Sequence, residues 1–324
     1  MNVKASKHSE TVGIVTVVGA GLMGQGIALQ FALHGFKVHL HDTSTEILDK
    51  SIVAISDNLR LLSGMDMADG SDIPAILDRI TADVSLEKSL NGSDLVIEAV
   101  YEDLDLKRSI FADLDELAPA HTIFASNTSS FMASQLVTNL TAGDRVLVAN
   151  WWNPPYLLPL VEVVPGPDTS QNSTDILCKL LKQAGKSPVV LQKESLGFIG
   201  NRLQFALLRE AISLVESGVA TAEDVDRVVT SSFGRRLAVA GPFEVFDIAG
   251  WDTILHIIDE LFPHIESSKM SPDTIRKMVE TGDLGVKSGR GFYTWDEGTV
   301  SDRRAQISEI LATLGRLGDA VNNK

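Results

Sequence analysis

Cysteine is nearly absent from this chain of 324 residues, which contains only Cys178. A single cysteine excludes an intramolecular disulfide framework and a cysteine-based zinc site, and we expect no metal site. Long apolar runs are also missing, because none reaches the roughly 18 residues of a membrane-spanning helix. The N-terminal stretch MNVKASKHSETVGIV is polar and lacks the apolar core of a signal peptide. These absences predict a reducing, cytoplasmic setting.

Positive charge is scarce as well. The chain has 28 Lys and Arg against 43 Asp and Glu, which gives a formal net charge of −15. Nucleic acids and anionic membranes need a basic face, so neither is an expected partner. An anionic small molecule would have to be held by local devices, such as a helix N-terminus or a single arginine. With 44% hydrophobic and 22% charged residues, the composition is that of an ordinary globular protein.

The first half of the chain alternates between short strand-like and helix-like segments. GIVTVVGAG at 13–21 is rich in β-branched residues and precedes a helical pattern that stops at Gly35. Further strand-like segments follow at 36–42, 93–100, 121–127 and 145–150. Strands that alternate with helices are typical of a parallel sheet covered on both faces. We therefore predict an α/β fold, with an N-terminal Rossmann-type doubly wound sheet.

The character of the sequence changes near residue 194. Residues 196–218 read as one long, broadly apolar helix, and the remaining segments carry few strand signals. We predict two domains, a Rossmann domain over residues 1–193 and an all-helical domain over residues 194–324. The helical domain is expected to contribute to substrate binding and dimerisation.

The segment VVGAGLMGQG contains a G-x-G-x-x-G motif between a strand and a helix. In this context Gly19 makes a tight turn, Gly21 lets the backbone approach a diphosphate, and Gly24 allows close packing of helix and strand. Asp42 ends the next strand, where its carboxylate can accept hydrogen bonds from a ribose diol and would repel a 2′-phosphate. We therefore predict an NAD site, although a tight turn without a ligand is the alternative. Its predicted residues are Gly19, Gly21, Leu22, Met23, Gly24 and Asp42.

Several ordered blocks between Ile14 and Trp295 strengthen this interpretation. They include VVGAGLMGQGIA, DLVIEAVYEDLDLK, SNTSS, NPPYLLPLVEVV, GFIGNRL, AGPFEVFDIAGWD and GVKSGRGFYTW. The chain thereby resembles the 3-hydroxyacyl-CoA dehydrogenase family. The resemblance is to its branch of small hydroxy-acid dehydrogenases, which includes gulonate 3-dehydrogenase with lambda-crystallin and carnitine 3-dehydrogenase. It implies an NAD-dependent enzyme that interconverts a 3-hydroxy acid, or a related secondary alcohol, and its ketone.

The resemblance also implies roles for individual residues. A histidine usually opens the block that reads NWWNPP here, and Glu162 matches the glutamate that orients it. Ser129 and Asn201 match the residues that hold the substrate oxygen. The remaining matches lie on the cofactor side of the site: Glu102, Lys107, Asn127 and Asn153. From the residues alone, Ser129, Asn153 and Asn201 could equally be turn or cap residues, and Glu162 could belong to a buried salt bridge.

Asn150 occupies the position of that histidine. Oxidation of an alcohol by hydride transfer needs a base with a pKa near neutrality, which imidazole provides and an amide does not. Three explanations stay open. The substitution is engineered, the proton goes to another group or to water, or the chain is a catalytically silent NAD-binding protein that resembles a crystallin.

Arg236 bears on the substrate. The small hydroxy-acid members carry a basic residue at this place, and a guanidinium can bind a carboxylate by two parallel hydrogen bonds. Arg235 and Arg236 could instead form a surface or interdomain salt bridge. Trp152 suggests a walled substrate pocket, but it could also be a core residue. A small free acid in the cleft between the domains is our expectation, with a CoA thioester as the competing substrate.

Overall fold

The computed structural model describes the backbone of residues 13–322 and the side chains as far as residue 315. The polar N-terminal stretch considered above lies outside these residues up to position 12. The chain divides into two compact units after Ile199, a few residues beyond the boundary expected from composition. Hydrogen bonds explain the difference, because Ser134 donates its backbone N–H to Glu194 and Ile199 donates its own to Glu162. The segment 194–199 therefore belongs to the first unit.

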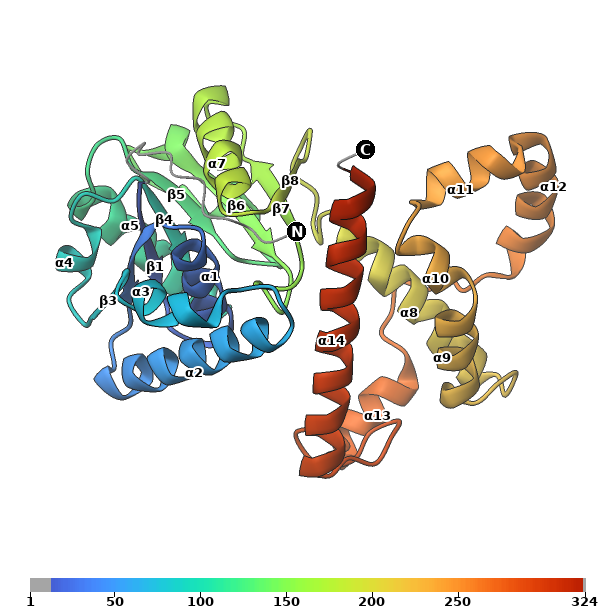
Figure 1. The fold of residues 1–324 in the computed structure, drawn as a ribbon. Helices are drawn as coiled ribbons and strands as arrows, with labels where there is room; N and C mark the ends of the chain where they lie inside the picture. The colour runs from blue at the N-terminus through green and yellow to red at the C-terminus, as the bar shows by residue number, and fades with distance from the viewer. Residues whose placement is uncertain (1–12, 323–324) are drawn as a thin grey trace. The chain divides into compact units, whose positions relative to one another are not determined.

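The first unit alternates strands and helices, as Figure 1 shows. Its strands are β1 (Ile14–Val18), β2 (Lys37–His41), β3 (Ile80–Asp83), β4 (Leu95–Glu98), β5 (Ile123–Ser126), β6 (Val146–Trp151), β7 (Leu160–Pro165) and β8 (Ser187–Val190). Its α-helices are α1 (Leu22–Leu33), α2 (Thr45–Gly64), α3 (Ile73–Leu77), α4 (Leu86–Leu90), α5 (Leu104–Leu117), α6 (Ala133–Leu136) and α7 (Gln171–Gln183). Short 3₁₀ helices cover Gly70–Asp72 and Gly143–Arg145.

The strands form one sheet in the order β3-β2-β1-β4-β5-β6-β7-β8. The pairs from β3 to β6 are parallel, which confirms the Rossmann-type fold predicted from the sequence. β6 and β7 are antiparallel, and β7 lies outside the segments that the sequence analysis reads as strands. The reason for the antiparallel direction is the short connection 152–159, which turns the chain back without the crossover helix that a parallel pair needs. This hairpin sets residue 150 directly opposite residue 162.

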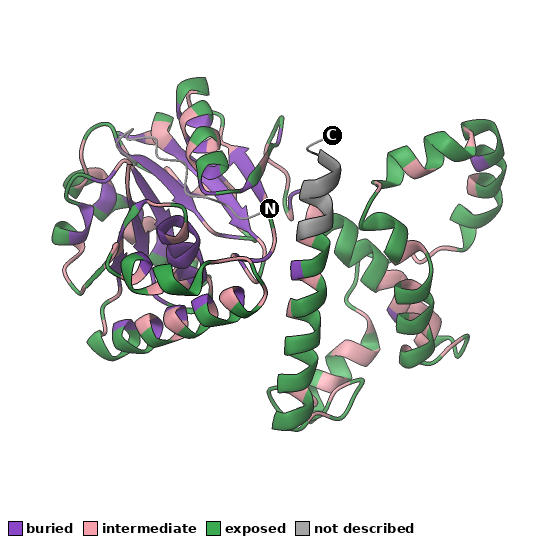
Figure 2. Cartoon of the chain, viewed as in Figure 1, coloured by how far each residue is buried: buried purple, intermediate pink, exposed green. Residues whose placement is uncertain are grey.

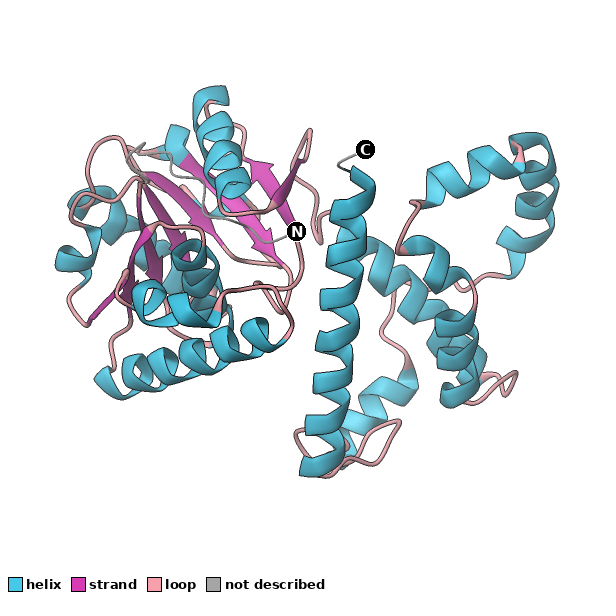
Figure 3. Cartoon of the chain, viewed as in Figure 1, coloured by secondary structure: helices cyan, strands magenta, loops and turns pink. Residues whose placement is uncertain are grey.

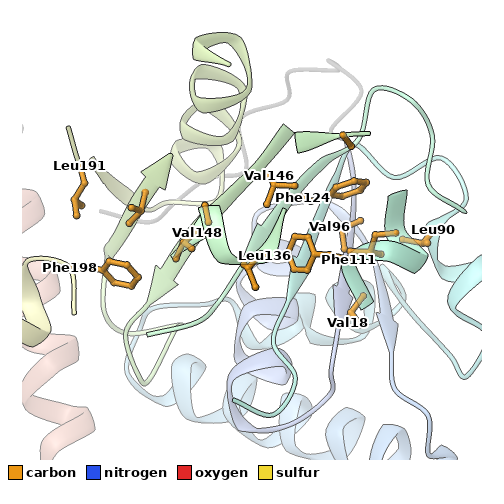
Figure 4. Close-up of a cluster of buried hydrophobic side chains, with 14 residues drawn as sticks. Val18, Leu90, Val96, Phe111, Phe124, Leu136, Val146, Val148, Leu191 and Phe198 are labelled. Atoms are coloured by element: carbon orange, nitrogen blue, oxygen red, sulfur yellow. The ribbon is translucent and has the colours of Figure 1, made fainter. Parts of the chain in front are cut away.

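Apolar side chains bury both faces of the sheet. Val146 and Val148 of β6 join a cluster with Phe111 of α5 and with Phe198, shown in Figure 4. Because side chains alternate along a strand, Asn150 points to the same face as these two valines. Trp151 points to the other face, where its ring meets Phe31 of α1.

The second unit consists of helices, whereas the described strands lie in the first unit (Figure 3). Its α-helices are α8 (Gly200–Glu216), α9 (Ala222–Ser231), α10 (Phe233–Leu237), α11 (Pro242–Ala249), α12 (Trp251–Leu261), α13 (Asp273–Thr281) and α14 (Glu297–Asn322). A 3₁₀ helix covers Phe262–His264. Many large apolar side chains of this unit are exposed, and Figure 2 shows little buried surface along its helices.

Two searches of the described residues concern membranes and metals. Between residues 13 and 322, no helix has the length and apolar character needed to span a bilayer. Within the same part of the chain, no group of three His, Cys, Asp or Glu side chains is arranged to hold a metal ion.

Candidate functional site

The glycine-rich turn between β1 and α1 is shaped by two close approaches. Gly19 has a φ of +101°, and a Cβ there would lie 2.7 Å from the carbonyl oxygen of Ala99. A Cβ on Gly24 would lie 1.7 Å from the carbonyl oxygen of Gly19. The turn therefore needs glycine at both positions: Gly19 for its positive φ and its approach to Ala99, Gly24 for its approach to the Gly19 carbonyl oxygen. Gly21 differs, since a Cβ there would meet no described atom within 4 Å.

The surroundings of Gly21 fit a diphosphate. Gly21 is the N-cap of α1, and no side chain caps this helix end. No acidic residue lies in the first turn of α1, so its N–H groups and dipole face no competing anion from that turn. Leu22 and Met23 follow directly, and the Leu22 side chain is exposed. The open space at Gly21 is thus a cradle that a side chain would fill.

Asp42 ties the end of β2 to the same turn. Its Oδ2 accepts a hydrogen bond of 2.9 Å from the Ala20 N–H, and its Oδ1 accepts one of 3.3 Å from Ser44 N–H. The residue is half-buried. A partly exposed carboxylate at this place can still accept hydrogen bonds from a ribose diol, as the sequence motif predicts.

A buried ionic network lies at the ends of β4 and β5. Lys107 Nζ is 2.7 Å from Glu98 Oε1 and 3.2 Å from Glu102 Oε2. Glu98 also accepts hydrogen bonds from the Ser126 hydroxyl, at 2.5 Å, and from the Val100 N–H, at 2.8 Å. The side chains of Glu98 and Lys107 are 0% exposed. Such a pair needs all of these partners, because an uncompensated buried charge is strongly destabilising.

Glu102 connects this network to the loop that carries Ser129. Its Oε1 accepts hydrogen bonds from the Thr128 hydroxyl (2.5 Å), the Ser129 N–H (3.2 Å) and the Ser130 N–H (3.1 Å). Burial alone would raise the pKa of Glu102, but hydrogen bonds from Thr128 and the charge of Lys107 outweigh it and lower that pKa. Glu102 is therefore an ionised carboxylate that fixes the backbone beside the exposed Ser129.

Asn150 and Glu162 form a buried pair across the β6–β7 hairpin. Asn150 Nδ2 donates a hydrogen bond of 2.9 Å to Glu162 Oε2, and both side chains are nearly inaccessible. Glu162 Oε1 accepts a second hydrogen bond, of 2.9 Å, from the Ile199 N–H. The amide thus makes the contact that one N–H of an imidazole would make to the same carboxylate.

The other expected cofactor contacts are Asn153, in the loop that follows β6, and Asn127, directly after β5. Asn127 Oδ1, at the end of β5, accepts a hydrogen bond of 3.0 Å from the Trp151 N–H, which fixes the start of this loop. Trp152 is half-buried and Asn153 is exposed. Pro155 packs against Gly26 of α1, where an added Cβ would lie 3.0 Å from the proline ring. The loop is therefore fitted against the helix that begins at the glycine turn.

Lys186 also holds this loop in place, through hydrogen bonds to its backbone. Its Nζ donates hydrogen bonds of 2.5 and 3.2 Å to the carbonyl oxygens of Pro155 and Leu158, and it lies 5.4 Å from the Trp151 ring centroid. Its side chain is buried, and no carboxylate pairs with it among the described residues. Burial lowers the pKa of Lys186 to about 7. The pKa of the neighbouring His34 is lowered as well, first by burial and then by the charge of Lys186.

We expect Lys186 to make stability increase with pH above neutrality. Between pH 7 and the ordinary lysine pKa, the unfolded chain keeps a proton that the folded chain has released. From pH 7 to pH 9 the free energy of unfolding should therefore rise by about 2 kcal/mol relative to Lys186→Met, which has no titrating group there. Urea denaturation of both proteins at the two pH values measures this difference. If the difference in free energy of unfolding between the two proteins were the same at pH 7 and pH 9, Lys186 would stay protonated in the folded protein.

The remaining predicted residues lie in the second unit. Asn201 is half-buried in the first turn of α8, and Arg236 is exposed on α10. Arg236 forms no ion pair with the described residues. The described residues of the second unit thus contain no surface ion pair of this arginine, which was one of its alternative explanations.

The structure brings together Asn150 with Glu162, and Glu102 with Lys107 and Ser129. Glu98 and Lys186 were missed by sequence reasoning. Glu98 carried a usable signal, because a carboxylate that ends the apolar run LVIE needs a buried partner, as Glu162 does in LVEVV. Lys186 gave no comparable signal, since lysines near the end of a helix are usually solvated.

Comparison with known proteins shows the family of this chain. The model of the 3-hydroxyacyl-CoA dehydrogenase NAD-binding domain matches residues 14–195, and that of the family's C-terminal domain matches residues 197–295. The mitochondrial hydroxyacyl-coenzyme A dehydrogenase of Sus scrofa is 38% identical over 299 residues, which cover 90% of this chain and 94% of that protein. The lambda-crystallin homolog of Homo sapiens is 36% identical over 324 residues, covering 97% of this chain and 98% of the relative.

A solved structure is similar over most of the chain. It is 5-formyl-3-hydroxy-2-methylpyridine 4-carboxylic acid 5-dehydrogenase, described as an NAD+ dependent dismutase. It superimposes with a TM-score of 0.88 at 28% identity, covering 94% of this chain and 98% of that one. Together the two family models match residues 14–195 and 197–295, which is most of the described chain. The chain belongs to the 3-hydroxyacyl-CoA dehydrogenase family and carries its NAD-binding domain.

Proposed function

We propose that this chain is an NAD-linked oxidoreductase that interconverts a small hydroxy acid and its ketone, and that Asn150 limits its rate. The observation that carries the proposal is the buried Asn150–Glu162 pair, because it keeps the carboxylate partner of a base but lacks the base. The similarity in fold to a dehydrogenase of a pyridine carboxylic acid supports a free acid as substrate.

The residues have separate tasks in this proposal. Bound NAD supplies the hydride acceptor. The cradle at Gly21 holds the diphosphate, and Asp42 holds the adenosine ribose. Ser129, positioned by Glu102, and Asn201 hydrogen-bond the reacting oxygen, while Asn127 and Asn153 contribute polar groups beside the cofactor. The oxygen still has to lose its proton, and an amide at position 150 cannot take it.

The site can be tested in two steps. Titration of NADH fluorescence with the purified protein measures the cofactor site, and we expect saturable binding. Turnover is then compared between free hydroxy acids and the corresponding CoA thioesters, where we expect faster reaction with the free acids. A preference for the thioester would favour the competing substrate, which the mitochondrial hydroxyacyl-coenzyme A dehydrogenase similarity also supports.

Arg236 is our candidate for binding the substrate carboxylate. Arg236→Ala should raise the Michaelis constant for a carboxylate substrate by about tenfold, since a charge-assisted hydrogen bond contributes roughly 1.5–3 kcal/mol. The affinity for NADH should stay largely unchanged. Arg235→Ala is the matched control, because that side chain already bonds the Thr230 carbonyl. A strong loss of NADH binding in Arg236→Ala would contradict the assigned role.

A catalytically silent NAD-binding protein is the second candidate. Asn150 favours it directly, and the similarity to a lambda-crystallin homolog adds to it. The distinguishing observation is tight NADH binding without turnover of any hydroxy acid, even after a histidine is introduced at position 150.

We also propose a homodimer formed through the second unit, in a cytoplasmic setting. Its exposed side chains include Leu203, Phe205, Phe243, Phe246, Leu255 and Phe262. A single copy leaves this apolar surface in water, and a second copy of the same surface could cover it. Sedimentation velocity should give twice the mass of the 35.0 kDa chain. The single cysteine supports the reducing setting.

A further inference from the structure

The network formed by the buried pair Glu98 and Lys107 with the partly exposed Glu102 carries a net charge. It has two carboxylates and one ammonium group, so one negative charge is left over. Each partner of Glu98 donates a hydrogen bond to it, which fits an ionised carboxylate. Ion pairing that only stabilised the fold would be complete with one carboxylate, so the second leaves an uncompensated negative charge.

The network lies at the carboxyl ends of two neighbouring strands in the middle of the sheet. Glu98 ends β4 and Ser126 ends β5, and the two residues pair directly. The strand order reverses between β1 and β4, and a dinucleotide binds across this point at the carboxyl ends of the strands. Asp42, directly after β2, marks the adenosine side. The nicotinamide half therefore belongs on the β4–β5 side, where the network is.

We propose that the net negative charge of Glu98, Lys107 and Glu102 strengthens the binding of oxidised NAD relative to reduced NAD at this site. The inference rests on the proposed function, because it requires that the site binds both forms. The nicotinamide ring carries a positive charge in NAD+ and none in NADH, whereas the rest of the cofactor has the same charge in both. A fixed negative charge near the ring thus strengthens binding of the oxidised form alone.

Burial makes the effect large enough to measure. Glu98 and Lys107 are 0% exposed and Glu102 is 37% exposed, so water and salt screen this group of charges less than they screen fully exposed acidic residues. A unit charge about 10 Å away in partly buried surroundings changes such a binding ratio by about tenfold. The lowered pKa of Glu102 keeps that carboxylate ionised at neutral pH.

Glu98→Gln and Glu102→Gln test the proposal, since each removes one negative charge with little change in shape. We expect the ratio Kd(NAD+)/Kd(NADH) to rise about tenfold in each variant. Fluorescence titration measures NADH binding and isothermal titration calorimetry measures NAD+ binding. Ser126→Ala is the matched control, because it removes a hydrogen bond to Glu98 without changing the charge, and it should leave the ratio unchanged.

The ratio separates electrostatics from structural damage. Damage to the site would weaken both forms by the same factor, and an unchanged ratio in Glu102→Gln would overturn the proposal. Should Glu98→Gln fail to fold in thermal melts, the partly exposed Glu102 decides alone. If the unmodified protein bound neither form, the proposed function itself would fail. If it bound both and no charge variant moved the ratio, only the present inference would fail.

Discussion

Asn150→His should raise turnover of a free hydroxy acid at least tenfold. A general base contributes roughly 10² to 10⁴ in rate, and Glu162 is already placed to orient an imidazole at this position. Asn150 donates its amide N–H to Glu162 Oε2 at 2.9 Å, so an imidazole N–H can take over the same hydrogen bond. The other ring nitrogen would then be available to accept the substrate proton. The rate of NADH formation at saturating substrate measures the gain.

The pH dependence of turnover is a second, independent test of whether the introduced histidine acts as the base. An imidazole accepts a proton only in its neutral form, so turnover of Asn150→His in the oxidation direction should rise with pH through a pKa near neutrality. The unmodified chain should lack this step. Asn150→Ala is the control for a change of volume, because it removes the amide without adding a base. Equal turnover of the unmodified and histidine proteins on a true substrate would mean that position 150 is not the base.

Glu162 provides the matched double variant. Introducing Glu162→Gln into Asn150→His removes the charge that stabilises the imidazolium, while Gln keeps an oxygen that can accept the hydrogen bond of Ile199. Most of the gained activity should then disappear. If the double variant kept the full rate of Asn150→His, the histidine would not depend on the Glu162 carboxylate, which would contradict the proposed pair.

The sequence predicted those parts of the fold that depend on local patterns. β1, β2, β4, β5 and β6 lie within or close to the segments read as strands, because short β-branched runs between helices have few alternative structures. β3, with sequence ITAD, was missed because its four residues lie at the edge and are not buried. β7 was also missed. Its antiparallel direction could not be read from its own residues, because the direction of a strand depends on the length of its connection.

The candidate site was predictable at positions that only one residue type can occupy. Gly19 and Gly24 are such cases, because the backbone approaches them too closely for any side chain. Partnerships were harder to predict. Glu162 was recognisable from the sequence as a buried carboxylate. Its position opposite residue 150, however, depends on the register of the β6–β7 hairpin. Lys186 depends entirely on tertiary contacts, since its two acceptors are carbonyl oxygens 31 and 28 residues away along the chain.

The glycine turn allows binding and stability to be separated. In Gly21→Ala the new Cβ meets no described atom within 4 Å, and the φ of −71° suits alanine. Stability should therefore change by no more than about 1 kcal/mol. The same methyl group would occupy the space that a diphosphate needs above the end of α1, so NADH affinity should fall by about 10- to 100-fold, or roughly 1.4–2.8 kcal/mol.

Gly24→Ala is the contrasting variant. Its Cβ would lie 1.7 Å from the Gly19 carbonyl oxygen, so the backbone of the turn has to move. Overpacking of this kind costs about 3 kcal/mol, and this protein should lose thermal stability together with NADH binding. Thermal melts and NADH fluorescence titrations of both variants give the comparison. Gly21, unlike Gly24, has open space beside it. A Gly21→Ala protein that bound NADH as tightly as the unmodified chain would therefore place the diphosphate away from this turn.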